Sequence, residues 1–418
     1  MNHKAESPAE PKRDFQIFML TFILVYFSSD TFMFGTNSNT FFTSIPRYIT
    51  IMLLLYLLVF YKSSGNWLSV FAYILALIFL FSISCFINEE TFMRYLSILI
   101  YILFAFVFAT RFSAAEFLKA LDKFLYIICI MAIIIEIVAY VSPSLIRLFP
   151  IVKVYAGSGI YNMFLGGIHQ EILMKPVIRT NGIFWEPGVF QIYINLCLMY
   201  QLFLCKKPDF RRVMIYIIAV LITFSTAGYI VLLWVLLIYA LFTYTNKDSK
   251  PTNVVFKVLI ISLLVFGLAF TIIFDSTFLY DNVFYKFQNT SSRTTAARIG
   301  SIFIPLDIAK DYPWFGIGAS KMPDETLARS IYIIGVNSQY NTNTFLFQFA
   351  AYGIPFGILF TLGTYFFTRS LSESKWVRLL LFGAIIMMYF NERLQSPLPF
   401  IIMTYGFINL SAARKKTA

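Results

Sequence analysis

The sequence predicts an all-α, polytopic membrane protein, and three observations support this fold class. Hydrophobic residues make up 59% of the 418 residues and charged residues only 13%, so a soluble domain would leave extensive apolar surface in water. The apolar residues fall into runs, most of them about 17 to 25 residues long, and a helix of that length crosses a bilayer. Basic residues gather between alternate runs. We therefore expect residues 1–418 to form a single integral membrane domain.

Twelve apolar segments are predicted to be membrane-spanning helices. The first two are short for a span, and residues 212–245 fit either one helix or two, because only Thr226, Ala227 and Gly228 interrupt them. The predicted spans are residues 15–29, 48–61, 67–87, 94–110, 124–142, 187–205, 212–226, 229–245, 254–274, 343–368, 376–390 and 396–410.

The distribution of charge predicts the orientation of these spans. Most of the 33 Lys and Arg residues lie between alternate spans, whereas the short loops on the other side carry only Arg47, Arg94 and Arg393. By the positive-inside rule, the basic side is cytoplasmic and both termini lie inside. This distribution explains the net charge of +12 without nucleic-acid binding. Two histidines and four cysteines within or beside spans predict no metal site, no disulfide framework and no cofactor.

Two outer segments are too long to be simple connections. They cover residues 143–186 and 275–342, and long loops in compact proteins usually carry function. We therefore expect the chemistry of this protein to lie on these two segments.

The first outer segment ends with an arginine and a helix-starting signal. Pro187 is suited to the first turn of a helix and disfavours helical geometry in the residue before it. Glu186 is therefore expected at the helix cap, beside unpaired backbone N–H groups that favour an anion. Arg179 precedes it by seven residues. The alternative is that Glu186 only caps the helix and Arg179 only contacts lipid headgroups.

The second outer segment is predicted to contain an amphipathic helix on the outer face of the bilayer, with a kink at Pro305. Its apolar stripe is expected to comprise Ile299, Ile302, Phe303 and Leu306. Arg298 precedes this stripe and would point back toward the spans. The alternative is a solvated surface helix with ordinary cations.

Two further features stand out because of their position. Glu136 lies within the apolar run of the fifth span, where an ionised carboxylate is costly and is expected to have a partner. A structural ion pair and a catalytic role both fit it. Asn391-Glu392-Arg393 occupies a tight outer turn, which fits either a supporting role for Arg393 or a charged cap between two spans.

The order of these motifs resembles the bacterial Wzy and O-antigen ligase superfamily of polysaccharide polymerases and ligases. Arg179-Thr180-Asn181-Gly182 followed by Glu186-Pro187-Gly188 resembles the first-loop signature of that superfamily. Arg298 followed by Pro313-Trp314-Phe315-Gly316-Ile317-Gly318 is similar to its second-loop arginine and glycine-rich turn. Asn343-Thr344-Phe345-Leu346 resembles the segment that opens the next span.

The resemblance implies a GT-C-like fold and a metal-independent glycosyltransferase of the bacterial inner membrane, active at its periplasmic face. The implied substrates are undecaprenyl-pyrophosphate-linked oligosaccharides, and membrane lipids, a chain-length regulator and a flippase are implied partners. Family ligases place a histidine where this chain has Thr342, so the sequence favours an O-antigen polymerase over a ligase. A lipid-linked oligosaccharide flippase or transporter, or a scaffold without chemistry, are the alternatives from other classes.

The resemblance and the residue patterns together define the predicted site. The predicted catalytic residues are Arg179, Glu186 and Arg298. The predicted substrate-binding residues are Asn181, Gly182, Arg293, Tyr340, Asn341 and Asn343, and the predicted supporting residues are Glu136 and Arg393.

Overall fold

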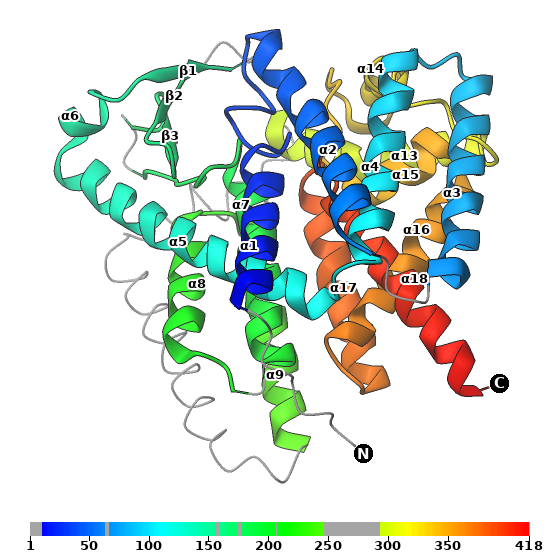
Figure 1. Ribbon diagram of the computed structural model, residues 1–418. Helices are drawn as coiled ribbons and strands as arrows, with labels where there is room; N and C mark the ends of the chain where they lie inside the picture. Colours follow the sequence, from blue (N-terminus) through cyan, green and yellow to red (C-terminus); the bar gives the residue numbers. More distant parts are fainter. Residues whose placement is uncertain are drawn as a thin grey trace.

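A computed structural model describes residues 11–62, 67–154, 159–173, 177–205, 207–245 and 293–417. These residues form a bundle of helices with a small sheet at one end (Figure 1). The predicted span at 254–274 and the first part of the second outer segment, 275–292, lie outside the described residues.

Each predicted span within the described residues overlaps one or two helices. Five helices or helix pairs (α2, α3, α4, α5, and α7 with η1) are long and apolar enough to cross a membrane by length and composition. The count of twelve spans stays a prediction. The helical elements are α1 (Pro11–Tyr26), α2 (Thr40–Phe60), α3 (Trp67–Ile87), α4 (Phe92–Ala109), α5 (Ala114–Val141), α6 (Pro143–Ile146), α7 (Pro187–Met199), the π-helix η1 (Tyr200–Leu204), α8 (Phe210–Ile222), α9 (Thr226–Thr245), α13 (Arg293–Asp311), α14 (Met322–Ile334), α15 (Thr344–Tyr352), α16 (Ile354–Phe367), the 3-10 helix η3 (Thr368–Ser370), α17 (Lys375–Asn391) and α18 (Leu398–Thr417).

Two helices begin earlier than hydropathy predicted, because caps rather than apolar runs define their starts. Asn39 caps α2 by accepting a hydrogen bond from the Phe41 N–H (3.0 Å). Ser113 and Glu116 form a capping box at the start of α5, in which each side chain accepts from the other residue's backbone N–H. The polar first turns of α5 were predicted to be a loop.

Two of the long apolar stretches, 212–245 and 343–368, each contain a short interruption between two helices. Residues 212–245 contain two helices, α8 and α9, but the predicted place of the break is wrong, because residues 223–225 separate the helices and Thr226, Ala227 and Gly228 begin α9. The predicted span at 343–368 is wrong as a single helix, because Gly353 (φ 91°) separates α15 from α16. A Cβ atom at Gly353 would collide with the backbone of Trp314, and the Ile354 N–H donates to the Pro313 carbonyl (2.7 Å). The glycine-rich turn at 313–318 therefore docks at this break.

The prediction of a purely helical chain is wrong at one place. The first outer segment contains a three-stranded antiparallel sheet in the order β1 (Ile151–Lys153), β2 (Gly159–Asn162), β3 (Gly167–His169), with Ile151 opposite Tyr161 and Ile160 opposite His169. These strands are only three or four residues long, so they leave little periodic signal in the sequence. Figure 1 shows the sheet at the upper left of the molecule, near α6 and above α5.

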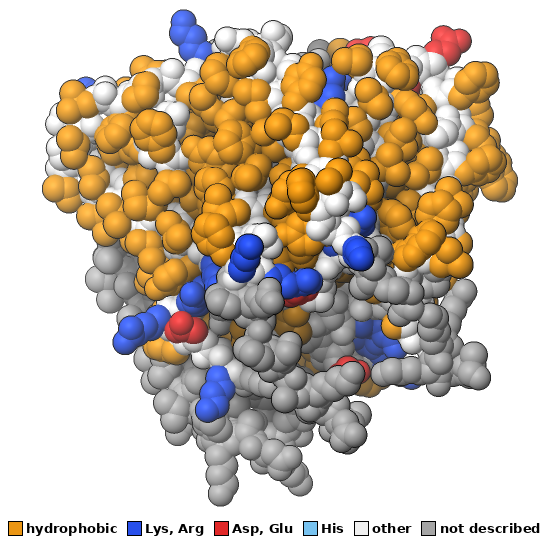
Figure 2. All heavy atoms as spheres, in the orientation of Figure 1, with side chains coloured by type: hydrophobic (Ala, Val, Ile, Leu, Met, Phe, Trp, Pro, Cys, Tyr) orange, Lys and Arg blue, Asp and Glu red, His pale blue; other side chains and the backbone are white. Residues whose placement is uncertain are grey.

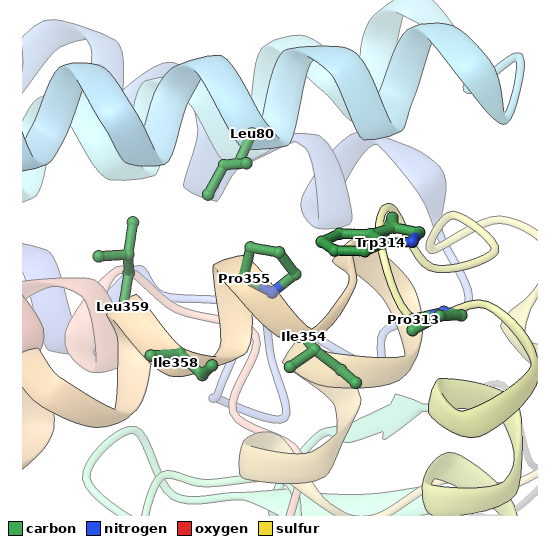
Figure 3. A pocket seen from close by; sticks show the side chains of 7 residues that line it. All are labelled: Leu80, Pro313, Trp314, Ile354, Pro355, Ile358 and Leu359. Atoms are coloured by element: carbon green, nitrogen blue, oxygen red, sulfur yellow. The ribbon is translucent and has the colours of Figure 1, made fainter.

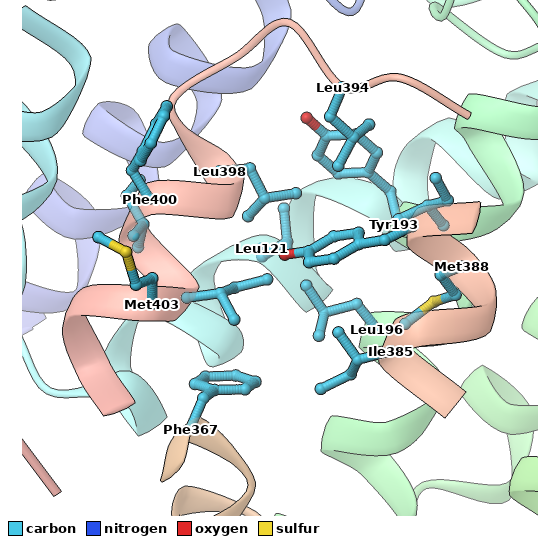
Figure 4. Close-up of a cluster of buried hydrophobic side chains, with 14 of the residues drawn as sticks. Leu121, Tyr193, Leu196, Phe367, Ile385, Met388, Leu394, Leu398, Phe400 and Met403 are labelled. Atoms are coloured by element: carbon cyan, nitrogen blue, oxygen red, sulfur yellow. The ribbon is translucent and has the colours of Figure 1, made fainter. Parts of the chain in front are cut away.

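The bundle is held together by close helix packing. Gly363 and Gly406 face each other's helices, and a Cβ atom at Gly406 would collide with the Gly363 backbone, so α16 and α18 approach closely there. Figure 4 shows side chains of α5, α7, α16, α17 and α18 meeting in a buried apolar cluster, with Leu394 near its upper edge and Phe367 near its lower edge.

The outer surface is apolar over a broad area. Figure 2 shows hydrophobic side chains covering the upper part of this face, and several Lys and Arg side chains along its lower border. Exposed members include Val59, Phe86 and Ile137. Such a surface belongs in a bilayer.

Candidate functional site

Four charged side chains from distant parts of the chain influence one another electrostatically. They are Arg179 from the first outer segment, Glu186 at the start of α7, Arg298 on α13 and Glu392 directly after α17. We call them the charged cluster. Arg179, Glu186 and Arg298 were predicted from the sequence to work together, and the fold brings these three together. Glu392 was not predicted.

Glu186 occupies the position that Pro187 predicted. It is the residue before α7, with extended backbone, and Pro187 is the first helical residue. Its side chain makes no capping hydrogen bond with the helix, so capping does not explain the carboxylate. Glu186 therefore presents its charge to the cluster, beside the N–H groups of the first helical turn.

Arg179 is partly buried and is held at the connection between α8 and α9. Its Nε–H donates to the Thr223 carbonyl (3.3 Å). Burial lowers the pKa of Arg179, and the negative charge of Glu186 opposes that effect. This bond uses Nε alone and does not involve the terminal nitrogens of the guanidinium.

Asn181 and Gly182, which follow Thr180, form a tightly packed turn after Arg179. Gly182 has a φ of 54° and packs against the Phe190 ring, where a Cβ would come within 3.1 Å. Asn181 is fully buried and its Nδ2 donates to the Phe184 carbonyl. These contacts are structural, and the prediction that Asn181 and Gly182 bind substrate stays a prediction.

Asp30, in the segment after α1, contacts the residues next to Glu186 and the turn that carries Glu392. The Trp185 N–H donates to the Asp30 carbonyl (3.2 Å), next to Glu186. The Asp30 carboxylate accepts from the Gln395 N–H and from the Tyr193 hydroxyl, each at 2.7 Å. Asp30 is fully buried, and burial raises its pKa. One residue therefore positions the end of the first outer segment, α7 and the turn that carries Glu392.

Glu392 is 2% exposed and packs over the first turn of α7. A Cβ atom at Gly188 would collide with the Glu392 carboxyl group, so the glycine makes room for this close approach. The Thr344 hydroxyl donates to the Glu392 carbonyl (2.5 Å) and accepts from the Leu394 N–H (2.8 Å). The turn after α17 is thus fastened to the start of α15.

The two carboxyl groups of the cluster differ in environment. Burial and the charge of Glu186 raise the pKa of Glu392 well above its ordinary value. Burial also raises the pKa of Glu186, but Glu186 is less buried and both arginines oppose the rise. Two adjacent carboxyls in a partly dry site favour one shared proton. We assign that proton to Glu392 because it is the more buried group.

Arg298 is exposed on α13. Phe303 and Leu306 of the predicted apolar stripe are 56% and 47% exposed, as residues that face lipid would be, and the contact of this stripe with the bilayer stays a prediction. A second row, which was not predicted, is buried inside the protein and comprises Ala296, Gly300, Ile304 and Ile308, spaced four residues apart. This row packs because α13 lies against α14 and α15, where small residues permit close contact.

Neither cluster arginine is consumed by an ion pair in the part of the chain that the structure describes. The salt bridges there involve other cations, such as Arg329, which pairs with Asp307, Asp311 and Glu325. Arg179 and Arg298 therefore interact with Glu186 and Glu392 electrostatically but not as salt bridges.

The predicted asparagines Asn341 and Asn343 lie directly before α15. Asn343 caps α15 by accepting from the Leu346 N–H (2.8 Å), and Asn341 accepts from the Asn343 N–H (2.9 Å). Both Nδ2 groups are buried and lack a hydrogen-bond partner among the described residues, as does Nδ2 of Asn391. Tyr340 is 66% exposed. The amides thus leave donors near the Glu392 turn.

Residues 213–361 match the O-antigen ligase family. The match supports the Wzy and O-antigen ligase superfamily, as the loop motifs predicted, and members of this family are glycosyltransferase-like enzymes in polysaccharide assembly. The matched region includes Arg298 and Asn343, whereas Arg179, Glu186 and Glu392 lie outside it. No curated protein and no solved structure matches the chain.

The structure changes one argument about the position where superfamily ligases have histidine. Thr342 binds α13 there, because its N–H donates to the Ser301 hydroxyl (2.9 Å). His169 of β3, however, lies within electrostatic range of Arg179, and its Nε2 is 3.2 Å from the Trp185 carbonyl. Burial lowers its pKa. An imidazole is therefore near the cluster, so the missing histidine no longer separates polymerase from ligase.

The remaining predicted residues differ in their relation to the cluster. Glu136 on α5 is 4% exposed and interacts electrostatically with Arg179, but neither of its oxygens has a hydrogen-bond partner among the described residues. Arg393 lies 3.7 Å above the Phe347 ring, and burial lowers its pKa to about 10. Arg293 begins α13, and only its backbone is described.

An apolar pocket of about 520 Å³ lies at the other end of α15. Its lining is Leu80 of α3, the Pro313-Trp314 turn, and Ile354, Pro355, Ile358 and Leu359 of α16. Figure 3 shows Leu80 facing Pro355 and Leu359 across the space, with Trp314 at one side. This lining offers almost no polar surface, so the pocket suits a hydrocarbon.

Proposed function

We propose that this protein is a glycosyltransferase that polymerises lipid-linked oligosaccharides. It transfers a growing glycan from undecaprenyl pyrophosphate onto a repeat unit carried by a second undecaprenyl pyrophosphate. The observation that carries the proposal is the convergence of Arg179 and Arg298, both without ion pairs in the described structure, at the carboxylate-bearing start of α7. The superfamily match agrees with this class of reaction.

The proposed reaction needs a base for the acceptor and a counter-charge for the leaving group. The oxygen of the acceptor hydroxyl forms a bond to the anomeric carbon of the donor. At the same time, Glu186 takes the proton from that hydroxyl. The bond from that carbon to the pyrophosphate oxygen breaks, and the pyrophosphate leaves with the electron pair. Arg179 and Arg298 stabilise its growing negative charge, because guanidinium stays protonated and holds two phosphate oxygens at once.

The amide donors near Glu392 support a saccharide acceptor. The Nδ2 groups of Asn341, Asn343 and Asn391 are buried without partners in the described structure, and buried polar groups normally find a partner. Sugar hydroxyls supply such acceptors. We place the acceptor sugar between these amides and Glu186.

A ligase that transfers the glycan to lipid A core is the second candidate. It is favoured by the family description and by the imidazole of His169 near Arg179. Exchanging the acceptor in one assay separates the two activities, because a ligase joins glycan to a core acceptor and a polymerase extends a lipid-linked repeat unit.

The purified protein should convert defined lipid-linked repeat units into a ladder of longer glycans on a gel. The ladder should form equally with divalent metal chelated, because the arginines supply the counter-charge. A ladder that requires added magnesium or manganese would overturn the metal-independent reaction. Repeat units that stay monomeric but cross liposome membranes would instead indicate a flippase.

We further propose that the apolar pocket holds part of the prenyl chain of a lipid-linked substrate. The nine residues of α15 separate the pocket from Asn343 by roughly 13 Å at 1.5 Å per residue. A substrate whose charged group lies at the cluster would thus extend its hydrocarbon toward the pocket.

Leu359→Trp should fill the pocket and raise KM for a full-length prenyl donor by about tenfold. The same variant should change KM little for a donor with a short prenyl chain. Ile137→Trp, at an exposed apolar position on α5, is the matched control. Equal KM changes for both donors would count against this occupant.

A further inference from the structure

The Glu392 carboxyl has no role in the reaction described so far, although several contacts hold it in place. It is 2% exposed, it covers the first turn of α7 at Gly188, and Thr344 and Asp30 fasten the turn that carries it. Its Oε2 is buried and lacks a geometric hydrogen-bond partner among the described residues. An ordinary structural carboxylate in such a dry position would have its oxygens satisfied.

The neighbouring groups explain what this carboxyl can do. Those that face it are Glu186 from the start of α7, Arg298 from α13 and Arg179 from the first outer segment. In the same turn, Arg393 contacts the Phe347 ring and Asp30 binds the Gln395 N–H. When both carboxyls ionise, the four groups of the cluster together have a net charge of zero. Desolvation nevertheless favours a proton on the more buried carboxyl.

We propose that Glu392 is a positioning residue that keeps its proton and donates it in a hydrogen bond to Glu186. This inference rests on the proposed glycosyl transfer, in which Glu186 is the base. A neutral Glu392 orients the Glu186 carboxylate toward the acceptor hydroxyl and keeps a second negative charge away from the leaving pyrophosphate. The proton of Glu392 is not consumed, because the acceptor proton passes to Glu186 and then to water.

This arrangement makes the active enzyme the singly protonated form of the pair. In acid, a second proton blocks Glu186. In alkali, loss of the shared proton adds a negative charge beside the leaving group. Activity should therefore fall on both sides of an optimum, and the two apparent pKa values belong to the pair.

The test is the pH dependence of kcat/KM for Glu392→Gln in the full-length enzyme with a lipid-linked repeat unit as substrate. Glutamine donates a hydrogen bond but cannot ionise, so the alkaline fall should disappear or move to higher pH. The rate at the optimum should decrease about tenfold, because an amide is a weaker donor to a carboxylate than a carboxylic acid is. Glu171→Gln, at an exposed position in the first outer segment, should retain the wild-type profile.

An alkaline fall at the wild-type pH in Glu392→Gln would overturn the inference. If that variant has too little activity to measure, infrared spectra of the purified proteins at neutral pH decide. Glu392→Gln should lack one band of a protonated carboxyl that the wild type shows, and an unchanged band refutes the assignment. Glu186→Gln separates the two proposals. If it is fully active, the base role in the proposed function fails. If it is inactive and Glu392→Gln keeps the wild-type profile, only the present inference fails.

Discussion

Arg298→Lys should lower the rate of glycosyl transfer by about 10²-fold, although the positive charge is kept. A lysine ammonium is a compact point charge, and it cannot hold two oxygens of a leaving pyrophosphate in a planar fork. Arg298 is exposed on α13 and has no ion pair among the described residues, so the fold should tolerate the change. The measurement is the single-turnover rate with saturating lipid-linked donor.

Two controls separate loss of the fork from general damage. Arg211→Lys changes an exposed arginine in the first turn of α8, and its rate should match the wild type. The thermal unfolding midpoint of Arg298→Lys should also be unchanged. A wild-type rate for Arg298→Lys would remove the arginine clamp from the mechanism, and a lower midpoint would attribute the loss to folding.

Asp30→Ala should destabilise the protein and lower its activity at the same time. The substitution removes the acceptor of the part-buried Gln395 N–H and of the buried Tyr193 hydroxyl, which keeps only its 3.3 Å contact with Ser396. Because neither donor is left fully orphaned, the free energy of unfolding should fall by roughly 1 to 3 kcal/mol. Because the turn with Glu392 loses its anchor, kcat should fall in the fraction that stays folded.

Asp30→Asn is the matched comparison for this prediction. Its carbonyl oxygen still accepts from Gln395, and its amide donates to the Tyr193 hydroxyl, which can still bond Ser396 (3.3 Å). We therefore expect a smaller loss than in Asp30→Ala. Denaturant unfolding in detergent and the transfer rate provide the two measurements. Equal stability of wild type and Asp30→Ala would show that Asp30 does not anchor the turn.

Local patterns predicted the parts of the site that depend on local chemistry. Pro187 predicted the start of α7 and the place of Glu186, because proline is restricted to the first helical turn. The apolar runs predicted the helices, although capping residues such as Ser113 moved their starts. Asn343 was placed correctly at the opening of a helix, but its capping bond could not be separated from a binding role.

The remaining features depend on contacts between residues far apart in sequence. Glu392 joins Glu186 only because α17 lies against α7, and no spacing in the chain records that contact. Asp30 was missed because a single acid between two apolar segments has no local partner. The proximity of His169 to Arg179 was not predicted, because His169 lies on β3 and the strands of this sheet are too short to show an alternating pattern in the sequence. The buried row of α13 was not predicted, because its neighbours α14 and α15 decide which face is covered by protein.

The linkage through residues 28–32 has a practical consequence for building chimaeras. The Thr31–Phe184 bridge and the Trp185–Asp30 hydrogen bond join this short stretch to the end of the first outer segment. Grafting residues 143–186 from another polysaccharide enzyme would therefore replace one of two segments that pair with each other and leave the other unchanged. Donor sequence for residues 28–39 must be exchanged with it if the hybrid is to acquire a new sugar preference rather than lose its shape.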